Sequence, residues 1–253
     1  MIAIIGGSGL SKLSSLDIDR REVVRTPYGE PSGALQFGHL CDQKTVFLAR
    51  HGYGHTIPPH AVNYRANIWA LKQAGAEAII SVASVGGIPD HMGPGVILVP
   101  DQIIDYTWGR KSTFFDGADQ PVVHVDFTEP YDGGLRQRIL AAAARAGETV
   151  LDGGTYAATQ GPRLETAAEI TRLERDGAHV VGMTGMPEAV LARELEVPYA
   201  AILVVANHAA GRGDSAHRIC MEQIEATLQQ AMGRVRNVLQ HFCTNGHDCA
   251  SHS

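Results

Sequence analysis

The stretch Tyr199-Ala200-Ala201-Ile202-Leu203-Val204-Val205-Ala206 decides the fold, and Asn207 follows it directly. An uninterrupted apolar run of this length is typical of a buried strand. In α/β proteins, ligands bind just beyond the carboxyl ends of such strands. We therefore expect the Asn207 carboxamide to lie in a binding pocket at the end of a central sheet.

Strand-like and helical segments alternate along the rest of the chain. Further strands are predicted at residues 2–5, 45–49, 78–83, 96–99 and 179–181. Helices are predicted at residues 63–74, 135–146, 166–176, 188–195 and 221–240. Thr166 and Glu169 have the spacing of a capping box, which marks the start of the third of these helices. The alternation favours one α/β domain over residues 1–242.

The composition is that of an ordinary globular protein. Hydrophobic residues make up 44% of the 253 residues and charged residues 19%, which argues against disorder. The formal net charge of -6 gives no general attraction to nucleic acid or to an anionic membrane surface. An anionic small substrate must therefore be held by local cations and N–H groups.

No signal peptide is visible at the start of the sequence. The first residues, Met1-Ile2-Ala3-Ile4-Ile5, lack a basic region and stop at glycines, so we expect a cytoplasmic protein. No apolar segment has the length of a membrane span. Residues 243–253 contain the metal-ligand types Cys243, His247 and Cys249, but without paired CxxC spacing we expect a polar, mobile tail and no metal site.

Glycines follow the first predicted strand in the run Gly6-Gly7-Ser8-Gly9. Backbone N–H groups of such a turn, together with the Ser8 hydroxyl, can surround an oxyanion. The run is not a dinucleotide fingerprint, because Lys12 stands where a third glycine is needed, and it is not a Walker A loop. The alternative is a tight turn that simply requires glycine.

Arg50 and His51 follow the strand predicted at residues 45–49. Arginine presents a fork of donors that suits phosphate, and a neighbouring histidine can donate a further hydrogen bond. The backbone at Ser84 and the hydroxyl of Thr184 stand at other predicted strand ends and can contribute to the same site. The alternative for Arg50 is a surface salt bridge beside a turn.

Glu165 and Asn207 form a pair suited to one kind of ring. A carboxylate only accepts hydrogen bonds, whereas a carboxamide both donates and accepts. A 6-oxopurine offers an N–H and a C=O side by side, which this pair can match. The two residues therefore bear on substrate choice, because a buried mismatch in such a pair is costly.

Together these residues resemble the family of trimeric purine nucleoside phosphorylases and 5′-methylthioadenosine phosphorylases. The resemblance covers residues 4–239. It rests on Gly6-Gly7-Ser8-Gly9-Leu10, Thr26-Pro27-Tyr28-Gly29, Arg50-His51-Gly52, residues 60–71, Gly161-Pro162-Arg163-Leu164-Glu165-Thr166 and Met183-Thr184-Gly185-Met186-Pro187-Glu188. It implies a three-layer α/β sandwich around a central mixed sheet, and a homotrimer or a dimer of trimers with sites at subunit interfaces.

The resemblance also implies phosphorolysis of a purine nucleoside with inorganic phosphate as co-substrate and no metal or organic cofactor. Position by position, the phosphate-binding residues are Ser8, Arg50, His51, Ser84 and Thr184. The substrate-binding residues are Leu164, Glu165, Met183, Asn207, Met221 and His124. Of these, Met183 packs on the ribose, and His124 reaches the 5′ pocket of a neighbouring subunit. The catalytic residues are Asn207, Glu165 and His51.

The branches of this family differ in the residues that contact the purine base and in those that contact the 5′ group of the ribose. Glu165 and Asn207 match the 6-oxopurine branch, whereas Arg163 and residues 183–188 match the methylthioadenosine branch. Met221 stands where 6-oxopurine phosphorylases place a histidine, and a thioether favours an apolar 5′-methylthio group. This hybrid resembles bacterial methylthioinosine phosphorylases, which convert methylthioinosine and phosphate to hypoxanthine and 5-methylthioribose 1-phosphate.

Other functions remain open at this stage. A general inosine and guanosine phosphorylase or a methylthioadenosine phosphorylase differs only in substrate. A nucleosidase that uses water, or a nucleoside-binding module without turnover, belongs to a different class. The oxyanion set of Ser8, Arg50 and His51 argues against the last two.

Overall fold

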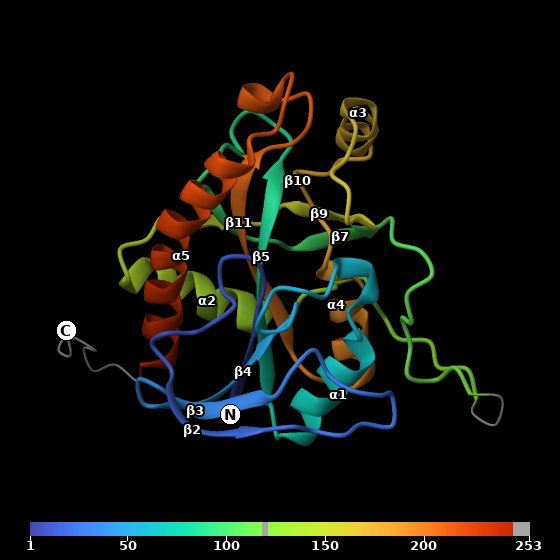
Figure 1. Ribbon diagram of the computed structural model, residues 1–253, viewed down its shortest axis with the longest axis vertical. Coiled ribbons are helices and arrows are strands. Elements are labelled where there is room, and N and C mark those ends of the chain that lie inside the picture. The colour runs from blue at the N-terminus through green and yellow to red at the C-terminus, as the bar shows by residue number, and fades with distance from the viewer. Residues whose placement is uncertain (118–120, 245–253) are drawn as a thin grey trace.

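The computed structural model describes residues 1–117 and 121–244, which form one α/β unit around a mixed sheet (Figure 1). The strands are β1 (Ile2–Gly6), β2 (Asp17–Glu22), β3 (Leu35–Leu40), β4 (Gln43–Ala49), β5 (Ala78–Gly87), β6 (Ile97–Val99), β7 (Gln102–Asp105), β8 (Leu151–Asp152), β9 (Thr155–Ala158), β10 (Val180–Gly182) and β11 (Tyr199–His208). The helices are α1 (Tyr64–Gln73), α2 (Gly133–Arg145), α3 (Ala167–Arg175), α4 (Gly185–Glu194) and α5 (Met221–Cys243). The expected fold class is confirmed.

A separate apolar core covers each face of the sheet, which gives the expected three layers. In β1, Ala3 and Ile5 belong to the core that includes α1 and α4. Ile2 and Ile4 belong to the core that includes α2 and α5. Successive strand side chains point to opposite faces, so a wholly apolar strand is expected where both faces are covered.

Parallel pairing brings four strand ends to one edge of the sheet. The central strands follow the order β4-β1-β5, and β11 also pairs with β5 in parallel. The glycine turn after β1, Arg50 after β4 and the end of β11 therefore lie close together. β10 runs antiparallel to β5, and Val181 pairs with Gly86 there, so residues 183 and 184 join the same edge.

Most of the predicted elements are present, with shifted boundaries. Asn63 caps α1, and Thr166 with Glu169 forms the predicted capping box of α3. β5 continues through Gly86 and Gly87, where a break was expected, because both residues pair with β10 and β11. The strand β2, whose exposed residues are largely charged, was not predicted, and neither were β3, β7, β8 and β9.

The C-terminal helix extends slightly beyond the predicted domain boundary. Cys243, assigned above to the tail, is the last residue of α5 and is buried. The remainder of the predicted tail, residues 245–253, lies outside the described part of the chain. Within residues 1–117 and 121–244, none of the helices is both long and apolar enough to cross a membrane.

Candidate active site

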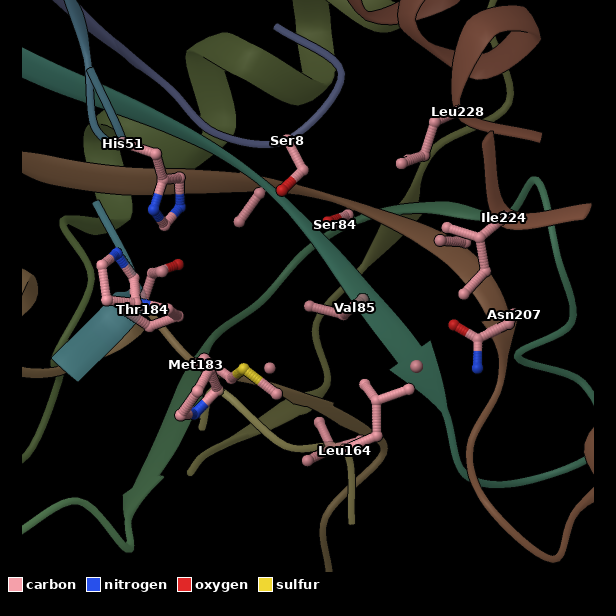
Figure 2. A pocket seen from close by; sticks show the side chains of 18 of the residues that line it. Ser8, His51, Ser84, Val85, Leu164, Met183, Thr184, Asn207, Ile224 and Leu228 are labelled. Atoms are coloured by element: carbon pink, nitrogen blue, oxygen red, sulfur yellow. The ribbon is translucent and has the colours of Figure 1, made fainter. Parts of the chain in front are cut away.

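A pocket of about 500 Å³ opens at the edge where the strand ends meet. It brings together ten of the eleven residues singled out from the sequence: Ser8, Arg50, His51, Ser84, Leu164, Glu165, Met183, Thr184, Asn207 and Met221. Figure 2 shows His51 and Thr184 on one side, Asn207 and Ile224 on the other, and Met183 and Val85 between them. One cavity therefore has a polar end and an end with both amide and apolar groups.

His124 is the exception. It is exposed in the segment between β7 and α2 and does not line this pocket. The role expected for His124 is in the 5′ pocket of a neighbouring subunit and not in the pocket of its own chain.

The glycine turn approaches its neighbours too closely for a larger residue. The N–H of Gly7 donates to the carbonyl oxygen of Val82 at 3.0 Å. A Cβ atom at Gly7 would lie 2.6 Å from Nη1 of Arg50, so only glycine fits without displacing the arginine. The turn presents Ser8 to the pocket, where its Oγ lies 3.5 Å from Nε2 of His55.

Arg50 is fully buried and paired with Glu188 of α4. Its Nε donates to Oε1 at 2.7 Å and its Nη2 to Oε2 at 2.9 Å. Both side chains are 0% exposed. Burial alone lowers the pKa of Arg50, but the Glu188 carboxylate outweighs burial and raises the pKa above its ordinary value. The bidentate fork thus faces a carboxylate, and the ion pair lies in the interior instead of on the surface.

His51 is held in one orientation by the backbone. Its Nδ1 lies 2.8 Å from the carbonyl oxygen of Ile57. Burial and the positive charge of Arg50 lower the pKa of His51 to about 4. The ring is therefore neutral near pH 7. Because a carbonyl only accepts, Nδ1 bears the proton and Nε2 can accept a hydrogen bond.

Thr184 precedes α4 but does not cap it. Its side chain makes no capping hydrogen bond, and its own N–H donates to the Tyr156 hydroxyl at 3.2 Å. The Thr184 hydroxyl can therefore serve a ligand in the pocket that it lines. Met186 and Pro187 have non-helical dihedral angles, so the regular turns of α4 begin only after them.

Glu165 lies in the loop before α3 and Asn207 lies near the end of β11, and both line the pocket. One carboxylate oxygen of Glu165 accepts from the Thr159 hydroxyl at 2.7 Å, and burial raises the pKa of Glu165 above its ordinary value. The Asn207 Nδ2 donates to the carbonyl oxygen of His208 at 2.6 Å, which leaves one N–H and Oδ1 for a ligand. A β-bulge between Val205 and Asn207 sets the direction of the asparagine.

Arg110 ties the Glu165 side of the pocket to the side of Met183 and Thr184, and this residue was not predicted from the sequence. Its guanidinium donates to the carbonyl oxygens of Thr159 and Gln160, next to the Glu165 segment. It also donates to those of Met183 and Met186. Arg110 lies in an irregular segment after β7, so neither spacing nor periodicity could have revealed this role.

The side of the pocket near α5 is apolar. Ile219, Met221, Ile224 and Leu228 line it, and Met221 is 62% exposed in this chain. Among these, only Met221 had been selected from the sequence. Ile224 and Leu228 of α5 share the helical spacing of buried residues, which does not distinguish a pocket wall from a core, and Ile219 precedes the helix.

Comparison with known proteins gives one consistent result. A family described as the phosphorylase superfamily matches residues 1–244. A probable S-methyl-5′-thioinosine phosphorylase from Pseudomonas syringae is 55% identical over 237 residues, covering 94% of this chain and 96% of that protein. A 6-oxopurine nucleoside phosphorylase from Pyrococcus furiosus is 50% identical over 215 residues, covering 83% of this chain and 80% of the relative.

Solved structures agree with the fold. Methylthioadenosine phosphorylase from Schistosoma mansoni, in complex with adenine, superimposes with a TM-score of 0.91 at 31% identity. The superposition covers 96% of this chain and 90% of the other.

Proposed function

The chain belongs to the phosphorylase superfamily, and we propose that it catalyses phosphorolysis of a 6-oxopurine nucleoside, with methylthioinosine as the preferred substrate. The products are hypoxanthine and 5-methylthioribose 1-phosphate. The observation that carries the proposal is that Glu165 and Asn207 share one pocket with Ser8, His51 and Thr184. The pocket thus combines groups for a purine base with groups for an oxyanion.

The base is recognised by complementary donors and acceptors. The Glu165 carboxylate accepts from N1–H of a 6-oxopurine, while the second N–H of Asn207 donates to O6 or N7. The hydrogen bonds from Thr159 to Glu165 and from Asn207 to the His208 carbonyl oxygen fix these orientations. Adenine presents an unprotonated N1 and an amino group, which leaves buried groups unpaired.

Phosphate occupies the other end of the pocket. The hydroxyls of Ser8 and Thr184 donate to its oxygens, together with the backbone N–H of Ser84. Neutral His51 accepts at Nε2 from a P–O–H group, so the site suits hydrogen phosphate. A phosphate oxygen then bonds to C1′ as the bond between C1′ and N9 breaks. The electron pair passes into the purine, and the proton given up by hydrogen phosphate reaches the departed base through solvent.

Asn207 accelerates this step because its hydrogen bond strengthens as charge develops on the departing base. The reaction uses phosphate as co-substrate and needs neither a metal nor an organic cofactor. Met183 packs against the ribose between the two polar ends. The apolar group Ile219, Met221 and Ile224 receives the 5′-methylthio group.

The decisive assay compares methylthioinosine, inosine, methylthioadenosine and adenosine, each with and without phosphate. We expect ribose 1-phosphate derivatives only when phosphate is present, and methylthioinosine as the best substrate. Release of free sugar without phosphate would identify a nucleosidase. Binding without turnover would identify a nucleoside-binding module, and a preference for inosine would favour a general 6-oxopurine phosphorylase, the name of the Pyrococcus relative.

The proposal includes a homotrimer in which His124 enters a neighbour's 5′ pocket. Its test is subunit complementation between His124→Ala and Asn207→Ala chains. When the two are mixed under exchange conditions, some sites combine an intact His124 with an intact Asn207, and activity should rise above that of either variant alone. No gain in mixtures shown to contain both chains would refute the shared site.

A further inference from the structure

A buried network surrounds the Arg50–Glu188 pair behind the pocket. The Glu188 carboxylate accepts four hydrogen bonds: one at Oε1 from Nε of Arg50, and three at Oε2 from Nη2 of Arg50, the Ser81 hydroxyl and the Tyr199 hydroxyl. Ser81 in turn accepts from Nη2 of Arg50 at 2.6 Å. All four side chains are buried, so their polar atoms are shielded from solvent.

The network accounts for nearly all the donors of Arg50. A guanidinium has five N–H groups. Glu188 takes two of them, Ser81 takes one, and the Val82 carbonyl oxygen accepts one from Nη1 at 3.1 Å. The remaining N–H, also on Nη1, has no hydrogen-bond partner among the described residues. It belongs to the nitrogen that lies against Gly7, beside Ser8.

The carbonyl group of Val82 links the same nitrogen to the glycine turn. Its carbonyl oxygen accepts from both Gly7 N–H and Arg50 Nη1. A rotation of the guanidinium would therefore disturb the turn that presents Ser8. The orientation of Arg50 and the shape of the glycine turn are mechanically linked.

We propose that Glu188 is a positioning residue for phosphate binding. It holds Arg50 so that a single N–H of Nη1 is directed to the phosphate end and the glycine turn keeps its shape. Ser81 and Tyr199 hold the Glu188 carboxylate in turn. This inference rests on the proposed phosphorolysis and extends it to residues outside the pocket surface. The pair also neutralises its own charge, so phosphate meets directed donors and no free cation.

Glu188→Gln separates positioning from packing. Glutamine has nearly the same shape, but its amide nitrogen is a donor that faces the donors of Arg50 or Tyr199. Arg50 then loses one of its two contacts and turns from Gly7. We expect the KM for phosphate to rise on the order of 10-fold or more, with the KM for nucleoside unchanged. The rise in Tm caused by added phosphate should shrink in parallel.

Glu148→Gln is the matched control. Glu148 pairs with Arg234 at 2.8 Å, away from the pocket. This variant should lose some stability while retaining the phosphate KM of the unmodified protein. Tyr199→Phe removes one hydrogen bond to Glu188, and Ser81→Ala removes one to Glu188 together with an acceptor of Arg50 Nη2. Both variants should raise the phosphate KM by smaller factors, even if Glu188→Gln fails to fold.

The outcomes distinguish the inference from the proposed function. If the unmodified protein shows no phosphate-dependent turnover, the proposed function is wrong, and the inference that rests on it is wrong as well. If it turns over and the folded network variants keep its phosphate KM, Glu188 is structural only and the inference is wrong. An equal rise in both KM values would likewise refute a specific role at phosphate.

Discussion

Nδ1 of His51 lies 2.8 Å from the carbonyl oxygen of Ile57, six residues later in the chain. The contact fixes both the ring orientation and the position of the proton in the neutral state. Protonation would add a positive charge beside Arg50 in a buried site, which explains the pKa of about 4. The residue proposed to bind phosphate therefore also makes folding sensitive to acid.

We expect acid destabilisation between about pH 6.5 and pH 4 from His51. In this range the unfolded chain binds a proton at His51 and the folded chain does not, so stability is present above the unfolded pKa and is lost as pH falls. A shift from 6.5 to about 4 is worth on the order of 3 kcal/mol. Urea unfolding of His51→Gln should show a smaller loss between these pH values than the unmodified protein.

The exposed His91 supplies the control for this measurement, since it lies outside the pocket. His91→Gln should retain the full acid sensitivity. An identical pH dependence in His51→Gln would show that His51 does not contribute.

The sequence predicted the strand ends well because glycines and charged residues interrupt apolar runs there. It predicted that Ser8, Arg50 and Asn207 lie at one edge of the sheet. It could not show that Arg50 faces Glu188, because that contact joins residues 138 apart in sequence. From the sequence, Glu188 was expected only to be a favourable charge near the N-terminus of a helix, and no neighbouring residue indicates that it is buried.

Arg110 is the clearest case of a role that local sequence cannot reveal. Four of its hydrogen bonds go to backbone carbonyls, which every residue has. The other two go to the side chains of Tyr64 and Gln160, which lie 46 and 50 residues away in the sequence. The strand β2 was missed for another reason. Its residues Asp17-Ile18-Asp19-Arg20-Arg21-Glu22 suit the edge of a sheet, where charge prevents further pairing but hides the strand pattern.

Arg110→Lys should reduce activity without changing substrate preference. Lysine keeps the charge but cannot span carbonyls in two segments with a planar fork. Both sides of the pocket lose support, so kcat/KM should fall on the order of 10- to 100-fold for inosine and methylthioinosine alike. Arg172→Lys, at an exposed pair with Asp176, is the control and should leave kcat/KM unchanged. A selective loss for one nucleoside would contradict a shared supporting role.

Met221→His should shift preference from methylthioinosine toward inosine. An imidazole can hydrogen-bond the 5′-hydroxyl, whereas the thioether provides an apolar contact. Because apolar pockets discriminate weakly, we expect the ratio of kcat/KM values to change by about 10- to 100-fold. Steady-state kinetics with both nucleosides give the ratio directly. An unchanged ratio would place the 5′ group elsewhere.

Discrimination against adenine should weaken in acid. Burial raises the pKa of Glu165, so its carboxyl becomes protonated at a higher pH than an exposed glutamate. The protonated form donates to an unprotonated N1 and no longer accepts from N1–H. The kcat/KM ratio of methylthioinosine to methylthioadenosine should therefore fall as pH decreases. Thr159→Val removes a hydrogen bond that favours the ionised form, and should move this fall to higher pH.

Asn207→Asp should narrow the preference for 6-oxopurines at neutral pH. In the proposed complex, Asn207 donates to the 6-oxo side and Glu165 accepts from N1–H, and adenine leaves both unpaired. Such buried mismatches cost about 10⁴-fold in kcat/KM. Aspartate accepts from the 6-amino group and repels O6, so methylthioadenosine should gain while methylthioinosine loses. The new carboxylate also loses the contact with the His208 carbonyl oxygen, so absolute rates should fall for both substrates.

Competition assays with the two nucleosides measure the ratio of kcat/KM values independently of that loss. If the unmodified protein prefers methylthioadenosine, or if Asn207→Asp leaves the ratio unchanged, Asn207 does not read the 6-position.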